Sequence, residues 1–93
     1  LHIAAVFACN FSNHMFTLAD KILQKTKVNF EILIPLIEQT IKKLKTNKPN
    51  TVQTGPAKRK DFHIINKHIE MLKDEESKKI YKLISKSIIK RNE

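Results

Sequence analysis

Uncharged hydrogen-bonding side chains gather on one side of residues 1–24, and they are the first candidates for contact with a ligand. At the spacing of an α-helix, one mostly polar arc contains His2, Asn10, Asn13 and Thr17, together with Val6, His14, Asp20, Lys21 and Gln24. Neutral amide and imidazole groups in such an arc can orient a polar ligand or a cofactor amide at a partly buried site. The same groups can also hydrogen-bond between the helices of an oligomer, and spacing alone favours neither interpretation.

The only glycine of the chain, Gly55, is followed by Pro56 and then by basic residues. Because glycine is the residue that most readily adopts unusual backbone angles, this Gly-Pro turn predicts a built loop that meets a ligand or a second domain. A chain with one glycine also has no Gly-x-Gly-x-x-Gly cradle and no P-loop. It therefore does not hold a nucleotide in the usual ways.

Metal, membrane and nucleic-acid chemistry are less well supported. The four histidines and one cysteine form neither a His-x3-His nor a Cys-x2-Cys pair, so no metal site is predicted. The lone cysteine fits a reducing cytoplasm, and no apolar stretch is long enough to cross a membrane. The net charge of +9 comes mostly from lysines spread along the chain, without interleaved aromatic residues. A basic helical nucleic-acid-binding domain is therefore the less favoured alternative.

The elements that must position these residues are all helical. Apolar periodicity predicts helices over residues 1–24, 30–45, 61–73 and 74–90, with a long connection over 45–60. The first helix is apolar around most of its circumference and about 36 Å long. A compact domain of this size has a radius of gyration of about 12 Å, so this chain alone cannot cover that helix. The fold class is an all-α bundle of about four helices with a long, mostly buried first helix.

Local signals refine three of these helices. Asn29 and Asp61 are predicted N-caps, and Pro35 indicates either a kinked start or a regular helix that begins nearer Ile34. His68 is predicted to lie in the core or in an inter-helix hydrogen bond. The periodicity also predicts buried stripes, formed by Leu33, Leu36, Ile37, Thr40, Ile41 and Leu44, by Ile65, Ile69 and Leu72, and by Ile80, Leu83, Ile84 and Ile88.

Several stretches together resemble one known family. The segment from His2 to Asn13 is similar to the opening of the helical C-terminal domain of a Rossmann-like oxidoreductase family, called domain of unknown function 2520. The similarity continues in the same order through residues 35–37, 53–61, 67–69 and 71–72. The Thr-Gly-Pro-x-x-Arg stretch is the most specific part of it, and the resemblance covers essentially the whole chain.

The resemblance implies an architecture and an activity. Full-length members carry an N-terminal NAD(P)-binding Rossmann domain, absent from this chain, followed by a helical domain like that of 6-phosphogluconate dehydrogenase and pyrroline-5-carboxylate reductases. Residues 1–93 would then be a single C-terminal dimerisation and substrate-side domain, inactive alone. The whole protein would be a cytoplasmic homodimer that uses NAD or NADP, held mainly by the missing domain, and no metal. It would transfer hydride to or from a small carbonyl or imine substrate.

By the same likeness, seven residues would line the substrate side of the cleft: His2, Asn10, Asn13, Thr54, Gly55, Arg59 and Asp61. His2 is the candidate proton donor, and the two asparagines would orient the substrate or the nicotinamide amide. Arg59 would bind a substrate carboxylate or phosphate, whereas Asp61 is favoured as an N-cap over a ligand.

One position departs from the family pattern. Lys60 stands where the family usually has glycine, and a positive φ there would strain the loop. This departure supports the alternative of a non-catalytic dimerisation or scaffold module.

Overall fold

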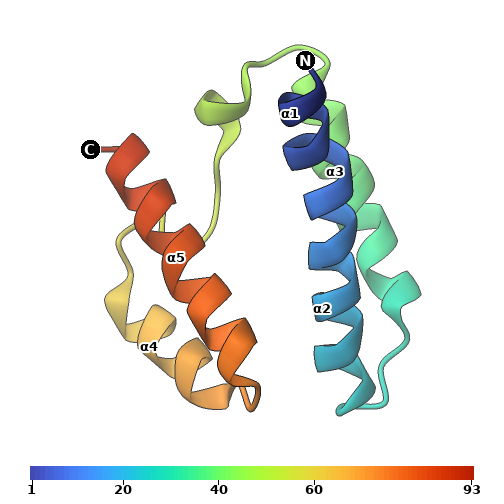
Figure 1. The fold of residues 1–93 in the computed structure, drawn as a ribbon, viewed down its shortest axis with the longest axis vertical. Helices are drawn as coiled ribbons and strands as arrows, with labels where there is room; N and C mark the ends of the chain where they lie inside the picture. The colour runs from blue at the N-terminus through green and yellow to red at the C-terminus, as the bar shows by residue number, and fades with distance from the viewer. The chain divides into compact units, whose positions relative to one another are not determined.

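The computed structural model describes residues 1–93, and every regular element in it is a helix (Figure 1). The prediction of an all-helical fold without strands is confirmed. The backbone contacts divide the chain into two compact units, Leu1–Glu38 and Gln39–Glu93, and each is described by itself below. The single domain expected over residues 1–93 stays a prediction. None of the helices combines the length and the apolar character that crossing a membrane requires.

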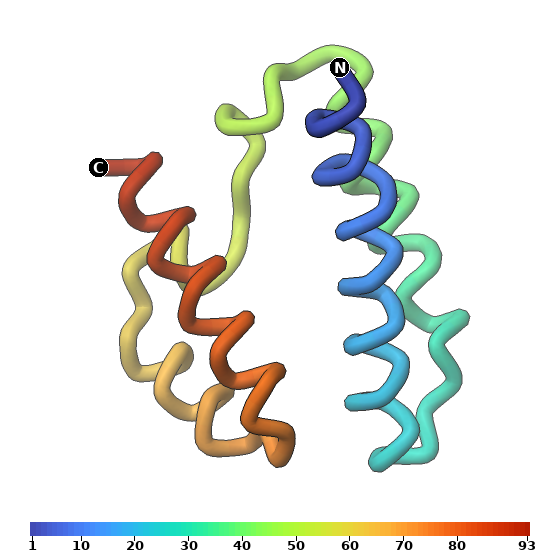
Figure 2. The backbone as a smooth tube through the Cα atoms, in the orientation of Figure 1, coloured from blue at the N-terminus to red at the C-terminus, as the bar shows by residue number.

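The first helix is continuous along the backbone (Figure 2). Its hydrogen-bonding type changes along its length. It consists of α1 (His2–Ala5), the π-helical segment η1 (Val6–Phe11) and α2 (Ser12–Gln24). Backbone angles at both junctions stay in the α region, so the predicted long helix is confirmed. A π turn contains about one residue more than an α turn, which rotates the residues beyond it by about 100°. The polar arc drawn at constant spacing therefore does not continue across η1.

The end of α2 is closed by a Schellman motif, and the next helix begins with a side-chain cap. Lys27 adopts φ 60°, and the two bonds Val28 N–H to Leu23 O and Lys27 N–H to Gln24 O are both 3.3 Å. Asn29 Oδ1 then accepts the Glu31 N–H at 2.9 Å at the start of the 3₁₀ segment η2 (Phe30–Leu33). The predicted Asn29 cap is confirmed.

The regular helix α3 (Ile34–Leu44) begins one residue before Pro35, at the later of the two predicted starts. Proline is tolerated there because the N–H groups of a first turn have no partner within their own helix.

The second unit contains η3 (Pro49–Val52), α4 (Phe62–Met71) and α5 (Glu75–Arg91). Asp61 Oδ1 accepts the Ile64 N–H at 3.2 Å, and Asp74 Oδ2 accepts the Ser77 N–H at 3.1 Å. These caps place both helices within two residues of their predicted bounds. The Asp61 cap itself is confirmed.

The pair α4 and α5 pack side by side (Figure 1) and are joined by a hydrogen bond of 2.8 Å between His68 Nδ1 and the Tyr81 hydroxyl. The two rings meet edge to face, with centroids 5.8 Å apart. The inter-helix alternative predicted for His68 is therefore confirmed. The core alternative is wrong, because His68 is exposed.

Burial raises the pKa of Tyr81 above its ordinary value of 10.0, and Tyr81 is the only tyrosine in a chain without tryptophan. Tyrosinate absorbance therefore reports this one side chain, and we expect its midpoint to lie above 10.0 in the folded protein. The unfolded chain ionises at the lower pH, so the free energy of unfolding should fall as the pH rises above about 10. A midpoint at or below that of the urea-unfolded chain would contradict the burial of this hydroxyl between α4 and α5.

The chain buries few of its apolar side chains. Only Ala57 and Ile65 are buried, with 6% and 7% of their surface exposed, and no residue of α1, η1 or α2 is buried. Much of the predicted stripes is exposed instead, since Leu36, Ile41, Leu44, Leu83 and Ile84 are 66%, 54%, 44%, 70% and 42% exposed. Small units have too little interior to cover so much apolar surface. The periodicity found apolar faces correctly but did not show what covers them.

Candidate functional site

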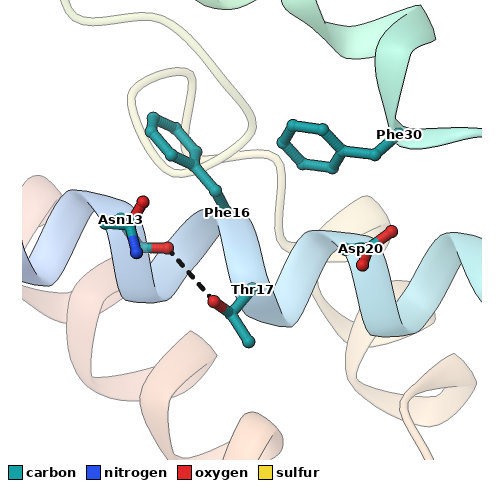
Figure 3. Close-up of a pocket in the computed structure, with 5 residues that line it drawn as sticks. All are labelled: Asn13, Phe16, Thr17, Asp20 and Phe30. Carbon is teal, nitrogen blue, oxygen red and sulfur yellow. Dashed lines mark hydrogen bonds between the residues drawn. The ribbon is translucent and has the colours of Figure 1, made fainter.

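A hollow of about 240 Å³ lies in each of the two units. The hollow of the first unit lies along α2 and is lined by Asn13, Phe16, Thr17, Asp20 and Phe30 (Figure 3). The hollow of the second unit lies between the end of α3 and η3 and is lined by Thr40, Lys43, Leu44, Pro49, Val52, Gln53 and Thr54. Both hollows are open to solvent.

The first hollow is built by one face of α2. Four of its lining residues follow the i, i+3, i+4, i+7 spacing of a helix face, from Asn13 to Asp20. Phe30, at the start of η2, adds an aromatic ring whose centroid lies 6.3 Å from that of Phe16, at an interplanar angle of 61° (Figure 3). The Thr17 hydroxyl donates to the Asn13 carbonyl at 3.4 Å. The hollow therefore combines two aromatic rings with a row of polar groups.

The predicted residues of the first helix are only partly brought together. Asn13 lines the hollow, but His2 is the first residue of α1 and Asn10 lies within η1, and neither lines it. All three side chains are exposed. The π turn separates His2 from Asn13, so their relation on a regular helix does not apply. Nothing in the sequence signalled this turn.

The other predicted residues lie on one short turn of the second unit. Gly55 has φ 102°, and a Cβ added there would meet nothing within 4 Å, so this position requires glycine for its backbone angle and not for space. After Pro56 the turn closes in a second Schellman motif, with Asp61 N–H to Pro56 O at 2.9 Å and Lys60 N–H to Ala57 O at 3.1 Å. Lys60 occupies the left-handed position of that motif with φ 55°. A lysine therefore occupies a backbone conformation that favours glycine.

Replacing Lys60 with glycine is expected to stabilise the protein by about 1 kcal/mol, because a side chain in the left-handed region costs about that much. Urea unfolding followed by circular dichroism measures the difference. Lys60→Ala keeps the Cβ atom and should give no such gain, whereas Lys27→Gly, at the matching position after α2, should give a similar one. Equal stabilisation by alanine and glycine at residue 60 would show that the charge, and not the backbone, is responsible.

The side chains of Arg59 and Asp61 differ in whether they have a hydrogen-bond partner within the chain. The half-buried Asp61 carboxylate caps α4, whereas the exposed Arg59 guanidinium has no hydrogen-bond or ion-pair partner in this chain. The neighbouring Lys58 Nζ donates to Asn92 Oδ1 at 2.8 Å, and Asn92 Nδ2 donates to the Ile88 carbonyl at 2.8 Å. These bonds tie the turn to the end of α5 and leave Arg59 available to a ligand.

Thr54 is exposed and lines the second hollow, and its carbonyl accepts a bond from Gln53 Nε2 at 3.0 Å. The predicted set therefore divides between the units. Residues 54–61 carry four of its members on one turn, and the first helix carries the other three.

Sequence reasoning missed two features of the first hollow. Neither Asp20 nor Phe16 is among the residues that the sequence predicts for the site. The i, i+3, i+4, i+7 spacing from Asn13 to Asp20 was the signal that could have joined them. Nothing local linked Phe30 to the same place.

The residues of this chain do not fit the phosphates of a dinucleotide. Its only glycine precedes Pro56, which has no N–H to donate, and the N-termini of α4 and α5 are capped by the carboxylates of Asp61 and Asp74. No group of three or more His, Cys, Asp or Glu side chains is placed to hold a metal ion.

Comparisons with known proteins agree with this architecture. The family profile described as domain of unknown function (DUF2520) matches residues 1–88. A crystal structure from Bacteroides fragilis, described as a "putative NADP oxidoreductase", superposes with a TM-score of 0.91 at 44% sequence identity. That match covers 96% of this chain and 35% of the solved chain, so the chain spans about a third of the length of its solved relative. No curated protein sequence matches the chain significantly. With its family profile matched over residues 1–88, the chain belongs to the domain of unknown function 2520 family.

Proposed function

We propose that this chain is the helical C-terminal domain of an NADP-dependent oxidoreductase. It would supply the dimer interface and the substrate side of the cleft for hydride transfer to or from a small carbonyl or imine substrate. The observation that carries the proposal is the match to the Bacteroides fragilis protein, at a TM-score of 0.91 and 44% identity. Identity at that level over 96% of the chain supports a shared role for the domain and, through the description of that protein, NADP as the cofactor.

The division of labour follows from what this chain contains. Because its glycine and its helix N-termini do not fit a dinucleotide, the rest of the longer protein would hold the cofactor, which supplies the hydride chemistry. In this domain Arg59 would bind a carboxylate or phosphate of the substrate through its free guanidinium. Asn10 and Asn13 would orient the substrate or the nicotinamide amide, and His2 would donate the proton.

A non-catalytic dimerisation module is the second candidate, and one observation favours it. Lys60 has a strained φ of 55° at a position where the family usually has glycine. Its side chain therefore occupies the place where a ligand would approach the turn. In that case the turn would serve only to connect η3 to α4. The polar residues of the first helix would then serve packing between subunits.

Cofactor binding by the full-length protein separates the two candidates. Titration calorimetry with NADPH and with NADH should show saturable binding, at least about tenfold tighter for NADPH. Oxidation of NADPH in the presence of small carbonyl and imine compounds then tests for turnover. If neither NADPH nor NADH binds, the oxidoreductase function is rejected and the dimerisation module is left as the candidate.

A further inference from the structure

Asp20 is a half-buried carboxylate without a cationic partner. Its only bond within the chain is from Gln24 Nε2 to Oδ2, at 3.2 Å. The chain carries 18 basic side chains, yet none of them forms an ion pair with this residue. A carboxylate without a cationic partner attracts a positive charge brought by a ligand.

The walls beside Asp20 suit the same kind of ligand. Phe16 and Phe30 are half-buried rings in edge-to-face contact, and the negative face of an aromatic ring attracts cations. Asn13 and Thr17 add oxygen acceptors along the helix (Figure 3). A single carboxylate beside two aromatic rings is a poor metal site but a suitable setting for an alkylammonium group.

We propose that the hollow formed by Asn13, Phe16, Thr17, Asp20 and Phe30 binds the positively charged amine of a small ligand. Asp20 pairs with the ammonium group, and Asn13 and Thr17 accept its remaining hydrogen bonds. The two rings attract the cation and also cover the aliphatic part of the ligand. The volume of about 240 Å³ admits a short amine. The inference that the substrate is an amine or its iminium form rests on the proposed function. The inference that the hollow binds an amine does not depend on it.

Three four-carbon probes test the charge preference on the full-length protein: n-butylammonium, n-butanol and n-butyrate. Ligand-observed NMR titration should show saturable binding of n-butylammonium only. Asp20→Asn should weaken it by about tenfold or more, since it keeps the shape of the side chain and removes its charge. Glu31→Gln makes the same charge change at an exposed position of the same unit and should leave the affinity within about twofold.

Phe30→Leu should weaken n-butylammonium by about threefold, because it keeps apolar volume but removes the ring. Equal binding of n-butanol and n-butylammonium, no binding of the ammonium, or an unchanged affinity in Asp20→Asn would each overturn the proposal. The outcome is separable from the cofactor test. If NADPH binds and n-butylammonium does not, this inference alone is rejected. If n-butylammonium binds and NADPH does not, the proposed function alone is rejected.

Discussion

Arg59→Ala in the full-length protein is expected to raise KM by about a hundredfold and to change kcat much less. The guanidinium is exposed and has no partner in this chain, while the bonds from Lys58 to Asn92 hold the turn that carries it. A group that is fixed at its base and free at its head can form a bidentate contact with a substrate carboxylate or phosphate. Because this contact forms in the ground state as well as the transition state, its loss appears in KM.

Steady-state kinetics of NADPH oxidation under saturating cofactor provide the measurement. Arg91→Ala is the matched control, since it removes the only other arginine, at the end of α5. It should leave KM within about twofold. Arg59→Lys should recover part of the loss, because it restores the charge but not the planar fork. A change below about twofold in Arg59→Ala would remove Arg59 from the site.

The elements that sequence reasoning predicted well are those fixed by local chemistry. The caps at Asn29 and Asp61 hydrogen-bond within three residues of themselves, so their effect is visible in a short stretch of sequence. Lys60 was expected to be strained if its position needed a positive φ, and it has φ 55°. The turn that closes on Lys60 is again local, with bonds that span five residues or fewer.

The features that could not be predicted depend on contacts between distant residues or on backbone conformations of nearly equal energy. The π turn at Val6–Phe11 differs from an α turn by one residue in its hydrogen bonding, and no side chain in it marks the change. It interrupts the predicted arc between His2 and Asn13, whereas the spacing of Asn13, Phe16 and Asp20 within α2 is that of a regular helix. The contact between Phe16 and Phe30 depends on how the chain turns after α2, which helix periodicity does not determine. The sequence showed the apolar stripes, but it does not show which surface packs against them, and that packing determines whether the stripes are exposed.

The first helix exposes apolar side chains from which we expect a large effect on the assembly of the protein. Ile3, Phe7 and Phe11 are 75%, 64% and 49% exposed, and the two phenylalanine rings stack edge to face with centroids 5.1 Å apart. Alanines at positions 4, 5 and 8 lie among them and allow a second helix to approach closely. Exposed apolar surface of this kind marks an interaction site, and we expect a second copy of the protein to cover it.

Phe7→Asp is therefore expected to convert the full-length protein from dimer to monomer at micromolar concentration. A charge at the centre of an apolar interface is left without a partner, and a change of about 3 kcal/mol raises the dimer dissociation constant by about a hundredfold. Light scattering measures the mass. Phe62→Asp is the matched control, because Phe62 is 55% exposed at the start of α4, where an acidic residue is tolerated near the positive end of the helix.

The two variants together distinguish the roles proposed for the domain. A catalytic domain predicts that Phe7→Asp lowers the mass and that Arg59→Ala raises KM without altering the mass. A dimerisation module predicts the first effect alone. A wild-type protein that remains monomeric at micromolar concentration would contradict both, because Phe7 and Phe11 would then stay exposed in a stable protein. The exposed face of the first helix would need a different partner, and the transfer of the family's dimeric architecture to this chain would lose its main physical support.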